Sequence, residues 1–202
     1  MEPSAAGEGR LERALAAIDA ANADDPFTIT VGGVVRPKEL AHAEMMTRWV
    51  RRLDPEASDE QLIAARAHHL RRWAIPRDDY PRDRPGYLRW RTALRRQHAD
   101  GVGRIMRDAG YDDESVARVQ AIVRKQGLGH DRAVQVHEDA LCLVFLETQF
   151  DELTAQLDDE DKMIDILRKT AAKMSPEGLA AAQELPYSPA GAALLARALA
   201  AA

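Results

Sequence analysis

Apolar residues recur at three- and four-residue steps along most of the chain, the spacing that places them on one face of an α-helix. The clearest stripe lies between Pro37 and Leu53, where Met45, Met46 and Trp49 are followed by Val50. Similar spacing predicts further helices over residues 11–23, 58–73, 87–109, 112–125, 131–151, 158–174 and 189–201, with a short one after Pro176. The pattern therefore predicts an all-α fold.

Two stretches interrupt the helical pattern. In Phe27–Arg36 (FTITVGGVVR), Gly32-Gly33 could form a tight turn between two very short strands near residues 28–36, although a loose loop fits nearly as well. Residues 74–86 contain three prolines and should form a loop. We find no internal repeat and no second domain, so residues 1–202 are predicted to form a single domain.

The composition is that of a globular protein. The chain has 202 residues, of which 46% are hydrophobic and 30% charged, and its 5% aromatic content favours helices over a β-sandwich. The single cysteine, Cys142, excludes an intramolecular disulfide and is expected to be core packing. The sequence shows neither a signal-peptide pattern nor a membrane-spanning stretch, so we expect a cytoplasmic protein with no membrane partner.

Charge is distributed unevenly along the chain. Residues 66–107 hold twelve arginines against four aspartates, a local charge of +8, whereas the remainder holds 16 basic and 29 acidic residues, or −13. An acidic protein with one arginine-rich segment is not suited to coating nucleic acid. It could instead hold one compact anion.

Four residues are candidates for a metal site, and each has a simpler explanation. His42 lies on an apolar helix face, but it could be a buried histidine satisfied by a carbonyl group. His68 and His69 point about 100° apart on a helix, so one could be buried and the other exposed. Asp139 precedes an apolar run, where an unpaired acid is costly, but it could be a helix-start charge.

The order of these residues resembles the HD superfamily of metal-dependent phosphohydrolases, whose pattern is His … His-Asp … Asp on a helical core. His42, His68 and Asp139 match that pattern, and His69 replaces its aspartate. The likeness covers about residues 37–147 and implies an HD-domain-like helical bundle around a metal-site core.

The whole chain is similar to the family called domain of unknown function 4202. That likeness is carried by the segments AAIDAANADDP, ARAHHLRRWAIPRDDYPRDRPGYLRWRTAL, EDALCLVFLE and DILRKTAAKMSP. It sharpens the expected fold but implies no established reaction.

We therefore predict one divalent transition metal ion bound by His42, His68, His69 and Asp139. Nitrogen-rich ligation suits Zn, Fe, Mn, Co or Ni better than Mg or Ca. An imidazole nitrogen cannot bridge two metals as a carboxylate does, so His69 predicts a single ion. Such an ion could lower the pKa of a bound water molecule.

The remaining candidates would serve a substrate. His98 is the predicted proton donor to a leaving group, although a solvated histidine is about equally consistent with its position. Arg71, Arg72, Arg77 and Arg91 are predicted to bind an anion, because arginine binds phosphate bidentately and stays charged. Most arginines of this segment should nevertheless form a solvated face.

The sequence leads to a hypothesis of function with two alternatives. We expect a metal-dependent hydrolase of a small phosphorylated or nucleotide-like molecule. The first alternative is an iron-dependent HD-type oxygenase, which in its two-iron form needs a bridging carboxylate; Glu138 could supply one. The second is a non-catalytic, metal-stabilised module that binds a small anion. Substrate, metal identity and oligomeric state are not determined by the sequence.

Overall fold

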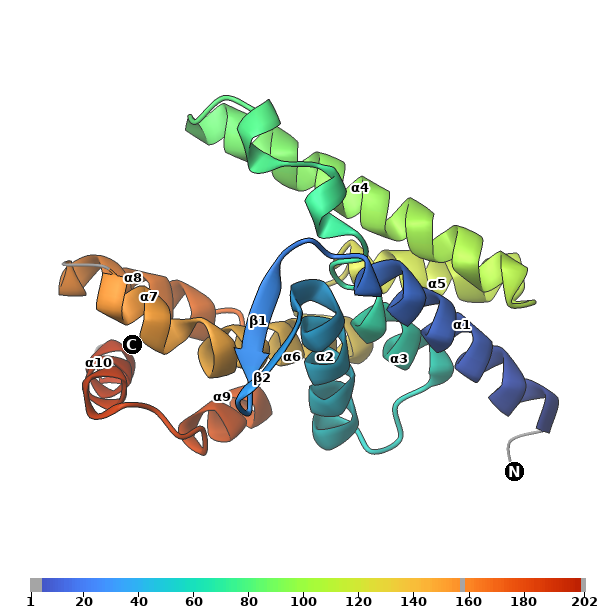
Figure 1. Ribbon diagram of the computed structural model, residues 1–202. Coiled ribbons are helices and arrows are strands. Elements are labelled where there is room, and N and C mark those ends of the chain that lie inside the picture. Colours follow the sequence, from blue (N-terminus) through green and yellow to red (C-terminus); the bar gives the residue numbers. More distant parts are fainter. Residues whose placement is uncertain (1–4, 157–158, 201–202) are drawn as a thin grey trace.

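The computed structural model describes residues 5–156 and 159–200, which form a helical protein with one short hairpin (Figure 1). Its elements are α1 (Ala5–Ala23), β1 (Thr28–Val31), β2 (Val34–Pro37), α2 (Lys38–Leu53), α3 (Asp59–Arg66), η1 (Arg72–Ala74), η2 (Arg77–Asp79), α4 (Arg84–Asp108), α5 (Asp113–Val123), α6 (Arg132–Thr148), α7 (Phe150–Gln156), α8 (Glu160–Ala171), α9 (Pro176–Gln183) and α10 (Pro189–Leu199). The all-α prediction is confirmed. Among the described helices, none is both long and apolar enough to span a membrane.

The hairpin predicted near residues 28–36 is present. Strands β1 and β2 pair antiparallel, with Thr28 opposite Pro37 and Val31 opposite Val34. Gly32 and Gly33 have φ angles of +57° and +80°, the left-handed conformation that a two-residue turn requires at both central positions. The hairpin leads directly into α2 and so fixes where that helix begins.

The buried apolar residues form two clusters that meet at α3. The α2–α6 core also takes side chains from α8, α9 and α10, whereas the α4–α5 core takes side chains from α1. Helix α3 serves both, because Leu62 and Ala65 face the α2–α6 core while Ile63 and Ala64 face the α4–α5 core. Figure 1 shows the same division, with α7–α10 at one end of the molecule, α1, α4 and α5 at the other, and α2, α3 and α6 between them.

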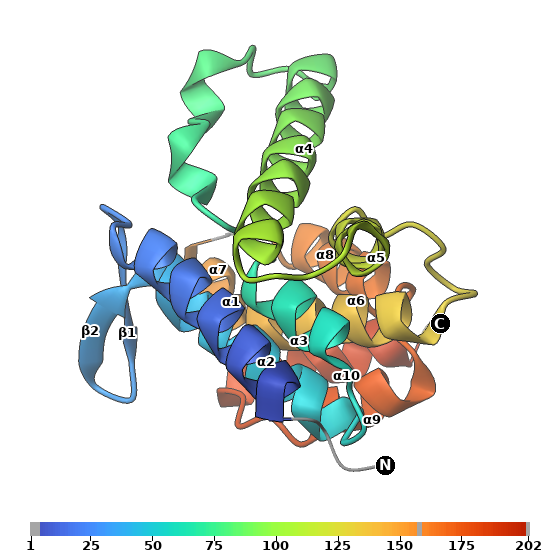
Figure 2. The ribbon, with the colours of Figure 1, turned by 90° about the vertical axis from the view of Figure 1, so that its right-hand side faces the viewer.

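Part of the arginine-rich segment rises clear of the rest of the molecule (Figure 2). Residues 72–83 and the first turns of α4 form an arm with two limbs that rises from the body (Figures 1 and 2). The indole N–H of Trp90 on α4 donates to the carbonyl of Ile75 at 2.9 Å and ties the two limbs together. The loop predicted from the prolines of residues 74–86 is present as irregular structure. It contains the short helix η2 and follows the short helix η1.

Helix α3 is shorter than its sequence pattern predicts, which matters for the site. It ends at Arg66 and not near residue 73, because the backbone tightens: Leu70 N–H bonds to Ala67 at 3.1 Å and Arg72 N–H to His69 at 2.9 Å. Likewise, Gln149 separates α6 from α7 within the predicted helix 131–151. The predicted helix start at Asp158 and helix end at Ala201 lie outside the described residues.

Removing the carboxylate of Asp131 is expected to destabilise the fold at neutral pH by roughly 1–2 kcal/mol. This side chain caps α6 through the backbone amides of Ala133 and Val134 and pairs with Arg118. The Arg118 guanidinium, together with these amides, lowers the pKa of Asp131 to about 2. Because the pKa is lower in the folded state, its stabilisation is present above the ordinary aspartate pKa and is lost between about pH 4 and pH 2.

Urea unfolding of Asp131→Ala at several pH values tests this prediction. The difference in unfolding free energy from the parent protein should shrink toward about pH 2. Asp24→Ala, which removes an exposed carboxylate, is the matched control. A difference that stays constant as the pH falls would contradict the assigned role.

Candidate functional site

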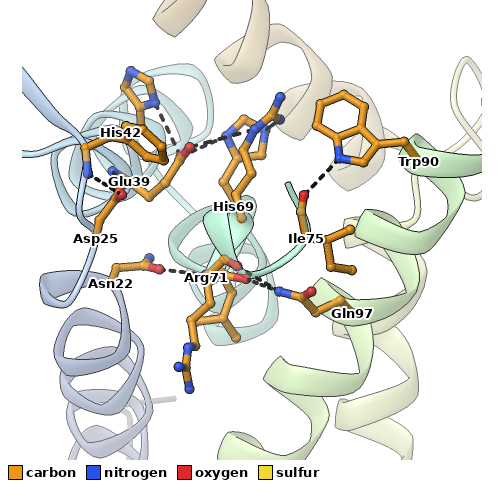
Figure 3. A network of polar contacts seen from close by, with 12 residues as sticks. Asn22, Asp25, Glu39, His42, His69, Arg71, Ile75, Trp90 and Gln97 are labelled. Carbon is orange, nitrogen blue, oxygen red and sulfur yellow. Dashed lines mark hydrogen bonds and ion pairs between the residues drawn. The ribbon is translucent and has the colours of Figure 1, made fainter. Parts of the chain in front are cut away.

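The first turn of α2 presents two buried polar side chains toward the interior. Glu39 and His42 are one turn apart and are only 5% and 4% exposed. The helix begins at Pro37, which offers no side-chain cap, and the carboxylate of Asp25 takes that role by accepting the Glu39 N–H at 2.8 Å. Asp25 also accepts the Phe27 N–H at 2.9 Å, so the loop before the hairpin fixes the start of α2 (Figure 3).

The histidine pair lies in the turn that follows α3. Arg71 closes this turn in the left-handed conformation, with φ +51°. Its N–H donates to the side-chain oxygen of Asn22 at 3.0 Å, and its carbonyl accepts from Gln97 at 2.8 Å (Figure 3). Contacts from α1 and α4 therefore hold the turn. Within it, His68 contacts His137 and His69 contacts Glu39.

Glu39, His42 and His69 form one compact group. A Glu39 oxygen lies 3.0 Å from His69 Nδ1 and 3.5 Å from His42 Nδ1, and each residue offers a ligand atom within 4.8 Å of the others (Figure 3). Two imidazoles and a carboxylate are a donor set that binds Zn or Fe(II) in proteins. His42 Nε2 is buried and finds no hydrogen-bond partner among the described residues, as expected of a nitrogen that binds a ligand. The group could therefore hold a metal ion.

Charges in this group are set by burial and by its neighbours. Burial opposes ionisation of Glu39, but His69 and His42 outweigh it, so the pKa of Glu39 lies well below its usual range. Burial lowers the pKa of His69, although the carboxylate of Glu39 acts in the opposite direction. The resulting state at neutral pH is an anionic carboxylate beside a neutral imidazole, the forms in which both residues bind metals.

His68 and His98 lie beside this group. His68 Nδ1 contacts Nε2 of His137 at 2.9 Å, so one of the two rings carries the shared proton. The His98 ring is 5.8 Å from the His69 ring, between centroids. Burial, the proximity of His69 and the charge of Arg72 lower the pKa of His98 to about 3. At neutral pH His98 can therefore form hydrogen bonds, but it holds no additional proton to donate.

Asp139, the fourth predicted ligand, is placed elsewhere. Its carboxylate accepts the Ser175 N–H at 2.9 Å, the Ser175 hydroxyl at 2.7 Å and the Gln135 amide at 3.0 Å. It thus joins α6 to the beginning of α9, and its buried charge is satisfied there. Among the described residues, the group with metal-ligand spacing contains Glu39 in place of Asp139 and does not include His68.

The predicted anion-binding arginines divide into two sets. Arg72 and Arg91 line the cavities beside the Glu39 group. Arg77 donates to the carbonyls of Tyr80 and Pro81 and lines another groove, of about 720 Å³, on which Glu39 and Arg72 also border. Arg71 is exposed and lines none of these cavities; its backbone, not its guanidinium, organises the turn.

Two adjoining cavities share His69, Arg72, Arg91 and Lys125. We call the one lined also by Glu39 and His42 the glutamate pocket, of about 280 Å³. The other, of about 230 Å³, we call the arginine pocket; its remaining lining includes His68, His98, Arg95, Tyr87 and Trp90. Among the described residues, no carboxylate lines the arginine pocket, whereas Glu39 and Glu138 both line the glutamate pocket.

Two residues of the site were missed from the sequence. Glu39 lies in the first turn of a helix. Acidic residues are common there because they interact favourably with the helix dipole, so its position did not indicate a further role. The sequence pattern places Lys125 at the end of the helix predicted over residues 112–125. In the structure α5 ends at Val123, and Lys125 lies just beyond it with a φ angle of +60°. The local sequence pattern does not distinguish Glu39 or Lys125 from ordinary residues at helix ends.

Comparison with known proteins gives one match. Residues 12–195 match the family described as Domain of unknown function (DUF4202). No curated protein and no solved structure matches the chain. The match covers nearly the whole chain, and the protein is therefore a member of the DUF4202 family.

Proposed function

We propose that this protein is a metal-dependent hydrolase of a small phosphorylated molecule, with Glu39, His42 and His69 as the metal ligands. The observation that carries the proposal is the buried His-His-carboxylate group at the edge of a cationic cleft. The order of His42, His68, His69 and Asp139 in the chain resembles the HD superfamily and supports it in part, because His42 and His69 belong to this group whereas His68 and Asp139 do not.

A bound divalent ion would supply Lewis-acid activation of a water molecule as the nucleophile. Zn and Fe(II) fit the two imidazoles and one carboxylate best, and a ligand set of three leaves positions for water and substrate. Mn, Co and Ni are less favoured alternatives.

The chain's own residues would bind and orient the phosphoryl group. Arg72 lies at the boundary of the two pockets, with its guanidinium 5.0 Å from the Trp90 ring and Nη1 3.1 Å from His69 Nε2. The guanidinium of Arg72 only donates, so Nε2 of His69 accepts from it; Nδ1 is the nitrogen left to bind an ion, which would replace the hydrogen that Glu39 accepts in the metal-free protein. Stacking and hydrogen bonding thus hold Arg72 in place, and its remaining donors could bind phosphoryl oxygens as negative charge develops.

His98 and Arg91 complete the proposed binding residues. Nε2 of His98 is buried without a hydrogen-bond partner and its ring lines the arginine pocket, so it could hydrogen-bond the leaving group. Arg91 lines both pockets and adds a second guanidinium. Burial of His98 keeps water from its ring and strengthens its interaction with an anion, whereas Arg91 is only half-buried.

An iron-dependent oxygenase is the second candidate. Two histidines and one carboxylate are the ligand set of mononuclear non-haem iron oxygenases, so the same group of residues supports that chemistry. This version needs one iron and no bridging carboxylate. The hydrolase is favoured because cationic side chains surround the site, and phosphoryl transfer needs them more than oxygen chemistry does.

Metal analysis of protein purified without added metal, followed by two activity assays, tests the proposal. We expect about one equivalent of a zinc-type ion and release of phosphate from some member of a panel of nucleotides and sugar phosphates. His69→Ala should lower both metal content and phosphate release, whereas the exposed His130→Ala should change neither. Bound iron with oxygen uptake would favour the oxygenase. If neither phosphate release nor oxygen uptake is detected, the result would favour a non-catalytic binding module.

A further inference from the structure

Lys125 adopts a backbone conformation that is unfavourable for a side chain of its type. Two helices in this chain end in the same motif: after α4, Gly110 and Tyr111 bond to Arg107 and Met106 at 3.0 Å each. After α5, Lys125 N–H bonds to Ile122 at 2.8 Å and Gln126 N–H bonds to Ala121 at 2.9 Å. The position with positive φ is glycine at the first end but lysine at the second. Glycine has no steric cost there, so local structure does not explain the lysine.

The side chain of Lys125 reaches the interior between the two pockets. It is 12% exposed, it forms an ion pair with Glu138, whose side chain is 5% exposed, and it lines both cavities. Glu138 lines only the glutamate pocket. An ammonium group has three hydrogens, so one can bond to Glu138 while the others remain available toward the arginine pocket.

Two arginines of α4 face the same cavity one helical turn apart. Arg91 contacts the hydroxyl of Tyr87 at 3.4 Å, and its guanidinium lies 5.8 Å from the Tyr87 ring. The side chain of Arg95 forms no hydrogen bond or ion pair with any residue that the structure describes. With Lys125 they place three cations around a space of about 230 Å³ that is lined by no carboxylate of the described residues.

We propose that Lys125, Arg91 and Arg95 form a subsite for a phosphate-type oxyanion in the arginine pocket, distinct from the group of metal ligands. Glu138 acts as a positioning residue that directs the Lys125 ammonium. This inference takes the phosphorylated substrate from the proposed function: the glutamate pocket receives the reacting group, and the subsite receives another anionic group of the same molecule. Strain at Lys125 is then a feature of the binding site, as is common for backbone strain at functional positions.

The test measures binding of inorganic phosphate to metal-free protein by calorimetry and by thermal shift, so it does not depend on hydrolysis. The parent protein should bind phosphate saturably, with a rise in melting temperature. The double variant Lys125→Gly/Glu138→Gln relieves the backbone strain and leaves no unpaired buried charge, so it should melt at or above the parent temperature. Loss of one charged hydrogen bond should nevertheless weaken its phosphate binding by about 10- to 100-fold.

Two control variants separate binding from structure. Glu138→Gln keeps the Lys125 charge and a side-chain oxygen that can still accept from its ammonium group, so positioning is retained and phosphate binding should change at most a few-fold. Arg96→Gln removes an arginine of α4 that is 84% exposed and lies outside the pocket, and it should bind as the parent does. Absence of saturable phosphate binding by the parent protein, or parent-like binding by the double variant, would overturn the subsite. Phosphate binding without any hydrolysis would leave the subsite intact and refute only the proposed reaction.

Discussion

Glu39→Gln is expected to weaken binding of a divalent ion by at least about 100-fold. Loss of a residue that only hydrogen-bonds to a metal ligand costs about 10- to 100-fold in metal affinity, and loss of a ligand itself should cost more. Glutamine has nearly the same shape, so the change mainly removes the negative charge that accompanies the two imidazole ligands. The backbone N–H at this position still donates to Asp25, so the start of α2 should be preserved.

A competition titration with a chromophoric zinc chelator measures this effect. Glu44→Gln is the matched control, since Glu44 lies on the same helix but pairs with Arg36 at 2.6 Å, away from the histidines. Metal affinity equal to that of the parent protein in Glu39→Gln would show that Glu39 is not a ligand. Circular dichroism of both variants would confirm that the helices remain folded.

Asp139→Ala is expected to lower the free energy of unfolding by about 2–4 kcal/mol while changing metal affinity little. The carboxylate is 1% exposed and accepts three hydrogen bonds, two of them from Ser175. Its removal leaves the Ser175 N–H without its acceptor, leaves the Gln135 amide with the Lys173 carbonyl alone, and weakens the attachment of α9 to α6. Urea denaturation with a parallel metal titration separates the two properties.

Ser175→Ala provides a graded comparison for this prediction. It removes the hydroxyl that bonds to Asp139 and caps Gly178 at 3.1 Å, but it keeps the backbone N–H that bonds to the same carboxylate. Its loss of stability should therefore be the smaller of the two. A large loss of metal affinity in Asp139→Ala, with unfolding unchanged, would restore Asp139 to the ligand set.

The positions of most helices follow from the sequence because their causes are local. Ser58 begins α3 with reciprocal hydrogen bonds to Gln61, as its spacing predicts, and Gly32-Gly33 forms the hairpin turn. The length of α3 was overestimated because its end depends on Asn22 and Gln97, which hold the turn at Arg71 from other helices. Apolar spacing carries no information about such distant hydrogen bonds.

Only part of the candidate site was predicted, because the sequence shows which polar residues are buried but not which partners they contact. His42 was identified as a candidate because it lies on the inward face of an amphipathic helix, and His69 because it follows an apolar run. Asp139 satisfied the same criterion, a buried acid that needs a partner, but the partner is 36 residues away in the chain. Burial of a polar group could be predicted from the sequence, whereas the choice between a metal ion and a serine required the structure.

Helix α3 has a consequence for how the protein opens. Its side chains pack into both cores, and the proposed ligands come from two segments around it, with His69 in the turn after α3 and Glu39 and His42 on α2. Local opening that separates the α2–α6 core from the α4–α5 core would therefore take the site apart before either core unfolds. Amide hydrogen exchange should show this as slower exchange around residues 67–71 when metal is bound, with little change in α10, which lies at the far end of the molecule (Figure 1).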